Sequence, residues 1–163
     1  MKKYLFIASL CTFITSTSNA QTSDEEAEAV LKLIGVQKKE AVGKLVAVTE
    51  KDSAAFWKLY DEYQQKNIDI GKARIQLYEK TADAYNNMTP KAADSLAQRY
   101  FEGRINQERA LEEYYKKIKA ATNAVVAFQF YQAEIYLQTL IRAYIMQEVP
   151  TYGEIQLNLD KKE

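Results

Sequence analysis

The chain of 163 residues contains no histidine and a single cysteine, Cys11. These two counts exclude histidine general bases, thiolate nucleophiles and nearly all the usual ligands of zinc, copper, haem and iron–sulfur centres. Carboxylates are numerous, but neighbours such as Asp61-Glu62 and Glu112-Glu113 diverge around a helix instead of converging on a substrate. We predict that the protein is not an enzyme and binds no cofactor or metal. Catalysis by carboxylates or by a Tyr/Arg site is the less favoured alternative.

Proline and glycine are also scarce, with 2 and 5 residues, and neither sign of charge dominates, since 22 Lys and Arg balance 22 Asp and Glu. A balanced charge produces no net field that would attract nucleic acid or an anionic membrane, so we expect no nucleic-acid partner. Few turn-forming residues, together with 47% hydrophobic and 27% charged residues, are typical of a helical protein. The composition predicts an all-α fold.

The first twenty residues have the layout of a secretory signal peptide. Lys2 and Lys3 precede an apolar stretch over residues 4–14, and small polar residues lead to a cleavage site after Ala20. The apolar stretch is far shorter than the roughly 20 residues that a membrane-spanning helix needs. We therefore predict a signal peptide over residues 1–20, export to the periplasm, and no stable membrane insertion after cleavage. Removal of the only cysteine leaves helix packing or partner subunits to hold the mature chain together.

Polar capping residues divide the rest of the chain into helices. Ser23, Thr49, Thr89 and the cluster Ala121-Thr122-Asn123 each precede a run of apolar residues with helical spacing, and side chains of this kind accept hydrogen bonds from the first helical amides. We expect helices over 24–47 and 50–85, from Pro90 to the cap-like cluster at 121–123, and from there to Pro150.

The second of these helices would be about 54 Å long at about 1.5 Å per residue, which is longer than a compact domain of this mass is wide. A tight turn after residue 85 places the next helix antiparallel to it. We therefore predict an elongated antiparallel helical hairpin of about four helices, with a single domain over 21–150 and a mobile tail over 151–163.

Tyrosine is the most frequent aromatic residue, with 12 copies. Tyr60, Tyr63, Tyr100 and Tyr114 fall on the helical seams, which favours packing in a core. Tyrosine also suits a surface that is wet when empty and dry when occupied. The helix after residue 123 is apolar around most of its circumference, so it is either the most buried element or an interface. A hairpin too thin to bury every ring would form a homodimer or bind clients.

Two segments resemble a known family. The first is Val48-Thr49-Glu50-Lys51-Asp52 followed by Ala55-Phe56-Trp57-Lys58-Leu59-Tyr60-Asp61-Glu62-Tyr63. It resembles the L-T-x-x-Q/E block of the Spy/CpxP-like (LTxxQ-motif) periplasmic α-helical proteins, in the branch that carries F-W-x-x-Y-x-x-Y after that block. Val48 and Asp52 stand where the motif has leucine and glutamine. The second segment, residues 128–145, resembles the F-x-Q-x-E-x-x-I-x-x-x-I-R helix of that branch.

The resemblance implies an envelope-stress protein with a helical-hairpin protomer, often a cradle-shaped dimer, that binds unfolded proteins without ATP or serves as the partner of a sensor. We expect a periplasmic ATP-independent chaperone or envelope-stress accessory protein whose partners are unfolded or misfolded envelope proteins. The alternative is a regulatory protein with one specific envelope partner and no catalysis. The candidate motif and partner-binding residues are Thr49, Phe56, Trp57, Tyr60, Tyr63, Phe128 and Tyr131.

Overall fold

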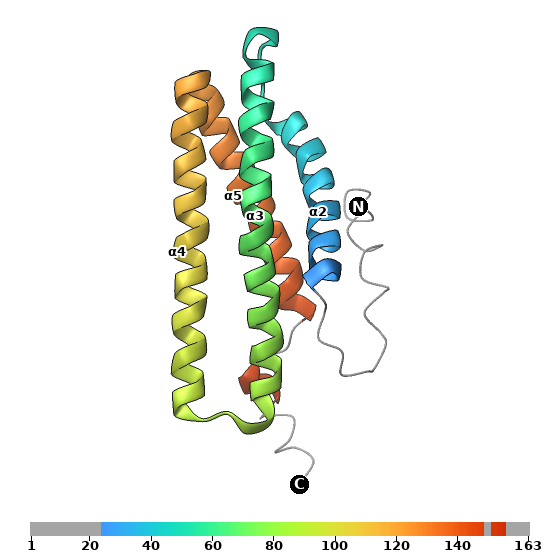
Figure 1. Ribbon diagram of the computed structural model, residues 1–163, viewed down its shortest axis with the longest axis vertical. Coiled ribbons are helices and arrows are strands. Elements are labelled where there is room, and N and C mark those ends of the chain that lie inside the picture. The colour runs from blue at the N-terminus through green and yellow to red at the C-terminus, as the bar shows by residue number, and fades with distance from the viewer. Residues whose placement is uncertain (1–23, 149–150, 156–163) are drawn as a thin grey trace.

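The computed structural model describes residues 24–148 and 151–155, and this part of the chain contains four long helices and no strand (Figure 1). The helices are α2 (Asp24–Leu45), α3 (Glu50–Ala84), α4 (Pro90–Ala121) and α5 (Ala124–Glu148), with a short 3-10 helix, η1 (Tyr85–Asn87), after α3. The prediction of an all-α fold is confirmed. The predicted signal peptide over residues 1–20 lies outside the described residues.

Three of the helices begin where the capping residues predict, and the fourth predicted cap, Ser23, lies outside the described residues. Thr49 has an extended backbone (φ −69°, ψ 157°), and its hydroxyl accepts a hydrogen bond from the Asp52 amide at 3.3 Å. Thr89 accepts from the Ala92 amide at 3.2 Å in the same way. The Asn123 side chain accepts from the amides two and three residues later, at 2.9 and 3.1 Å. These bonds satisfy backbone amides that have no partner within their own helix.

The helices α3 and α4 form the long hairpin that dominates Figure 1. With 35 residues, α3 is about 52 Å long at about 1.5 Å per residue. Helix α5 returns obliquely behind α3, and α2 lies along α3 on the side away from α4 (Figure 1). The elongated antiparallel hairpin is therefore confirmed, whereas the homodimer stays a prediction.

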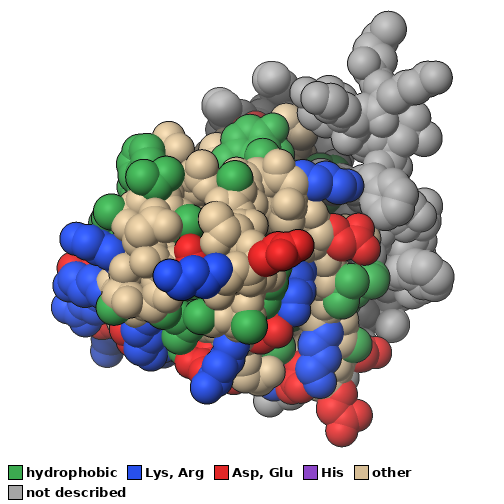
Figure 2. All heavy atoms as spheres, turned by 90° about the horizontal axis from the view of Figure 1, so that it is seen from above, with side chains coloured by type: hydrophobic (Ala, Val, Ile, Leu, Met, Phe, Trp, Pro, Cys, Tyr) green, Lys and Arg blue, Asp and Glu red, His purple; other side chains and the backbone are tan. Residues whose placement is uncertain are grey.

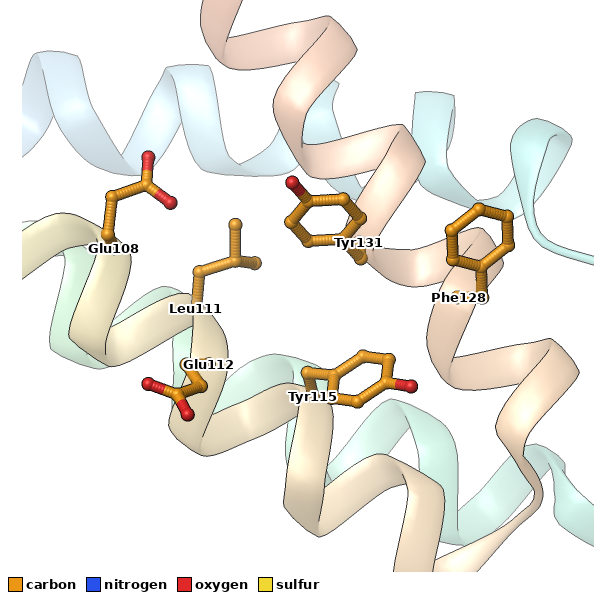
Figure 3. Close-up of a pocket in the computed structure, with 6 residues that line it drawn as sticks. All are labelled: Glu108, Leu111, Glu112, Tyr115, Phe128 and Tyr131. Atoms are coloured by element: carbon orange, nitrogen blue, oxygen red, sulfur yellow. The ribbon is translucent and has the colours of Figure 1, made fainter.

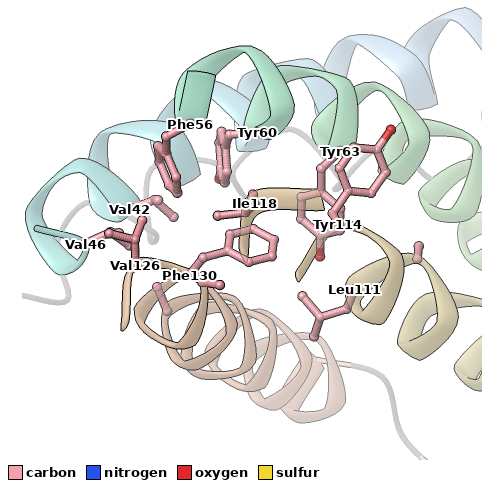
Figure 4. Close-up of a cluster of buried hydrophobic side chains, with 13 residues drawn as sticks. Val42, Val46, Phe56, Tyr60, Tyr63, Leu111, Tyr114, Ile118, Val126 and Phe130 are labelled. Carbon is pink, nitrogen blue, oxygen red and sulfur yellow. The ribbon is translucent and has the colours of Figure 1, made fainter. Parts of the chain in front are cut away.

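An aromatic cluster forms the centre of the core, in the half of the molecule where all four helices meet (Figure 4). The Phe130 ring of α5 meets the rings of Phe56, Tyr60 and Tyr63 edge to face, at centroid distances of 6.5, 6.2 and 5.2 Å. This geometry places ring edges against ring faces, which is the favoured arrangement for aromatic pairs. Aliphatic residues from α2, α4, α5 and the α2–α3 connection complete the cluster, among them Val42, Val46, Leu111, Ile118 and Val126.

Helix α2 packs tightly against α3 at a glycine. A Cβ atom at Gly71 would lie 2.6 Å from a methyl carbon of Leu31, so any larger residue would force the leucine to move. Lys72, the next residue of α3, forms an ion pair with Glu28 of α2. Apolar packing and ion pairing therefore hold the first half of α2 against α3.

A short helical turn follows α5 at residues 152–155, within the segment that we predicted as a mobile tail. Glu154 accepts hydrogen bonds from the Thr151 amide at 2.7 Å and hydroxyl at 2.8 Å, and its own amide donates to the Thr151 hydroxyl. This reciprocal pattern is a capping box. The Tyr152 ring lies 5.5 Å from the Tyr85 ring, which brings the turn to the α3–α4 end of the molecule. Residues 156–163 lie outside the described part of the chain.

Candidate functional site

The structure separates the predicted partner-binding residues into an inner and an outer set. Phe56, Tyr60 and Tyr63 are fully buried in the core. The prediction that these three contribute to an accessible binding surface is therefore corrected, because they occupy the face of α3 that α2, α4 and α5 enclose. Thr49 is the N-cap of α3, so its observed contacts are structural.

Trp57 lies at the margin of the core and is half-buried. Its ring meets the Phe56 ring edge to face at 4.9 Å and rests beside Gly43 of α2, where an added Cβ would lie 3.6 Å away. The Lys39 ammonium lies over the ring, 5.5 Å from its centroid. These contacts give Trp57 a structural role at the junction of α2 and α3.

Sequence reasoning missed the most unusual residue of the interior, Glu134 of α5, which is fully buried. Its Oε2 atom lies 2.8 Å from Lys38 Nζ and accepts hydrogen bonds from the Tyr63 hydroxyl at 2.8 Å and from Gln138 Nε2 at 3.2 Å. Its Oε1 atom accepts from the Tyr60 hydroxyl at 3.3 Å. The network joins α2, α3 and α5, and no buried side-chain polar atom of the described residues is left without a partner.

The network determines how the two tyrosines ionise. Burial raises the pKa of both Tyr60 and Tyr63 far above the ordinary value of 10.0, and the negative charge of Glu134 raises it further. Both phenols therefore stay protonated and donate to the carboxylate. This arrangement pairs the buried carboxylate with two phenol donors and stabilises a folded interior.

A sequence signal for Glu134 does exist. It is the only charged residue between Ala124 and Ile141, in a helix that is otherwise apolar. A lone acid in such a helix needs a cationic or hydrogen-bonding partner from elsewhere in the fold, because burying an unpaired charge is costly. That partner is Lys38, which lies 96 residues away in the chain and is brought to Glu134 by the packing of α2 against α5.

The outer set consists of Phe128 and Tyr131, which line a shallow hollow between α4 and α5 (Figure 3). Their side chains are 51% and 40% exposed, and their rings stack at a centroid distance of 6.5 Å with an interplanar angle of 24°. The hollow has a volume of about 290 Å³. We call it the aromatic groove; its lining residues are Glu108, Leu111, Glu112, Tyr115, Phe128 and Tyr131.

Helix α4 supplies the other wall of the aromatic groove. Leu111 is buried and forms its floor, and Tyr115 is half-buried beside it. Phe101 and Ile105 continue the exposed face of α4 beyond the groove, because spacings of three and four residues return to one face of a helix. These two side chains are 60% and 48% exposed. Apolar side chains therefore recur along this face of α4 over about 21 Å, from Phe101 to Tyr115, with Glu108 and Glu112 between them.

Two carboxylates give this wall a negative rim. Glu112 forms an ion pair with Lys116 at 2.5 Å, and the hydrogen bond from that lysine lowers the pKa of Glu112. Glu108 takes part in none of the ion pairs formed within the described part of the chain. In Figure 3 its carboxylate and the Tyr131 hydroxyl lie on the same side of Leu111. The groove therefore combines an apolar floor with one uncompensated negative charge.

The remaining surface gives few indications of function. Figure 2 shows acidic and basic side chains interspersed among apolar ones on the end of the molecule that carries the α4–α5 turn. Residues 24–148 and 151–155 contain no group of three or more acidic, histidine or cysteine side chains placed to hold a metal ion. None of the helices described has the length and apolar character that crossing a membrane requires.

Comparisons with family models, with curated proteins and with solved structures found no match to this chain.

Proposed function

We propose that the protein is a periplasmic, ATP-independent chaperone or envelope-stress accessory protein that binds apolar segments of unfolded polypeptides. The observation that carries the proposal is the aromatic groove, where Phe128 and Tyr131 remain 51% and 40% exposed although the same helix packs the core with its other face. Exposed apolar patches on a folded surface mark interaction sites. The signal-peptide layout of residues 1–20 and the resemblance of residues 48–63 to an envelope family support the compartment and the class.

The size of the surface suits weak, reversible binding. Covering the exposed half of a phenylalanine or tyrosine side chain contributes about 1 kcal/mol. Phe128, Tyr131, Phe101 and Ile105 together would therefore contribute about 4 kcal/mol before the cost of association is subtracted. Even before that cost is subtracted, this value corresponds to a dissociation constant of only about 1 mM, so one segment alone binds more weakly than that, and several segments of one client bind more tightly together. A chaperone that needs no ATP must release its client by spontaneous dissociation, which weak binding of each segment allows.

The test measures light scattering of a chemically denatured, aggregating client with and without the purified protein, in the absence of ATP. We expect suppression that depends on the dose of the protein and that is weakened by Phe128→Ser. The matched control is Tyr136→Ser, because Tyr136 lies on the same helix, is 56% exposed and does not line the groove. Both variants should retain the helical circular dichroism of the parent.

Equal suppression by the Phe128→Ser and Tyr136→Ser variants would contradict the assignment of the groove. The absence of suppression with several clients would contradict the chaperone and favour the alternative, a regulator with one specific envelope partner. Capture of proteins from an envelope extract separates the two functions, because a chaperone should retain many proteins and a regulator should retain one.

A further inference from the structure

The aromatic groove presents two chemically different surfaces to an occupant. Leu111, Tyr115 and Phe128 provide an apolar floor and walls, whereas Glu108 provides a carboxylate at one end (Figure 3). In Figure 3 the Tyr131 side chain comes from the facing helix, and its hydroxyl end is turned toward the side of the hollow where Glu108 lies. A purely apolar segment would cover the floor, but it would also remove water from the Glu108 carboxylate and supply no hydrogen bond in exchange.

The charges around the groove point to the sign of its occupant. Its lining contains two carboxylates and no basic side chain. Lys116 neutralises Glu112 from one helical turn away, at 2.5 Å. Arg104 lies one turn before Glu108 on α4, but no ion pair joins them. Glu108 therefore remains available to a cation supplied by the partner.

The aromatic rings add a second preference for a cation. The face of an aromatic ring attracts an ammonium or guanidinium group, and a carboxylate beside the ring strengthens the preference. Within this structure the same chemistry occurs at Lys117, whose ammonium lies 4.3 Å from the centroid of the Tyr114 ring while it pairs with Glu113 at 2.7 Å. Tyr131 and Glu108 both line the groove, so they present a ring and a carboxylate to the same occupant.

We propose that the aromatic groove selects polypeptide segments in which a lysine or arginine stands beside bulky apolar residues. The apolar side chains cover Leu111, Tyr115 and Phe128, and the cation lies between the Glu108 carboxylate and the Tyr131 ring. The inference rests on the proposed function, because it specifies the client segments that the same groove binds.

The experiment measures fluorescence anisotropy of two labelled synthetic peptides that are identical except that the first carries lysine where the second carries glutamine. We expect the lysine peptide to bind roughly three- to tenfold more tightly in dilute buffer, the range of an exposed ion pair combined with a cation–π contact. The preference should decrease at about 1 M salt, where the screening length is about 3 Å. Glu108→Gln should abolish it.

Two further variants make the result specific. Glu102→Gln is the matched control, since Glu102 is an exposed acid of α4 about 120° around the helix from Glu108, and it should keep the preference. Phe128→Ser should weaken the binding of both peptides. Equal affinities for the two peptides, or a preference that survives Glu108→Gln, would overturn the charge selection and leave the proposed function in place. Failure of both peptides to bind, or binding that Phe128→Ser does not weaken, would overturn the groove as a client site.

Discussion

Replacing Lys38 with methionine removes the one cation of the described residues that pairs with Glu134 and keeps a side chain of similar length. Glu134 is fully buried, and the Lys38 side chain is 10% exposed, so little solvent can substitute for the lost charge. The hydrogen bonds from Tyr63 and Gln138 would remain, but a buried carboxylate without its cationic partner typically costs about 3–5 kcal/mol. Since domains of this kind are stable by about 5–15 kcal/mol, Lys38→Met should remove about a fifth or more of the folding free energy.

A double-mutant cycle tests the cause of this loss. Glu134→Gln removes the charge and keeps acceptor and donor atoms for the network, so it should cost less than Lys38→Met. The double variant Lys38→Met/Glu134→Gln leaves no unpaired charge and should recover most of the stability. We therefore expect strong coupling between the two positions: the double variant should lose much less free energy of unfolding than the two single variants lose together.

The assay is urea unfolding followed by far-ultraviolet circular dichroism, with the midpoint and the slope compared among variants. Lys32→Met is the matched control, because Lys32 pairs with Glu28 on the same helix at 2.8 Å but its side chain is 61% exposed. That variant should lose less than about 0.5 kcal/mol. A loss below about 1 kcal/mol for Lys38→Met would refute the argument, because it would mean that Glu134 carries no uncompensated charge in the variant.

Three other perturbations follow from the packing and the titration behaviour. Gly35→Ala should raise the free energy of unfolding by about 1 kcal/mol, since no atom of a neighbouring element lies within 4 Å of the added Cβ. Gly71→Ala should give no such gain, because its Cβ would lie 2.6 Å from a leucine side chain. The urea midpoints of the two variants test the difference. The raised pKa values of Tyr60 and Tyr63 provide stability below the ordinary pKa of 10.0 that is lost at higher pH, so tyrosinate absorbance should show two phenols ionising only with unfolding. Hydrogen bonds from Lys117 and then Lys66 lower the pKa of Glu113 to about 2. The stability that ionised Glu113 contributes is therefore present above pH 4.5 and disappears as the pH falls towards 2. Over this pH range the urea midpoint should fall less in Glu113→Gln than in the parent.

The helix boundaries were predictable because the signals that set them are local. Thr49, Thr89 and Asn123 accept hydrogen bonds from amides no more than three residues away, so the sequence alone contains both partners. The capping box of Thr151 and Glu154 is a signal of the same kind that our sequence analysis overlooked. Helix pairing followed from the short connections between the caps.

The division of the aromatic residues between core and surface was not predictable in the same way. Phe56, Tyr60 and Tyr63 recur at helical spacing, which shows that they share a face but not which elements cover that face. Three other helices enclose it, and this arrangement depends on the oblique return of α5 and the docking of α2. The partner of Glu134 lies 96 residues away for the same reason.

The two faces of α5 explain why its sequence is apolar around most of its circumference. Phe130 and Glu134 face the core and its polar network, whereas Phe128 and Tyr131 face the aromatic groove. A change at Phe130 must disturb three aromatic contacts, but a change at Phe128 removes one stacked neighbour and a surface that is already half-exposed. The folding free energy therefore constrains Phe130 strongly and Phe128 weakly. Because folding constrains position 128 only weakly, the binding that we propose at the groove would give an aromatic residue a purpose there.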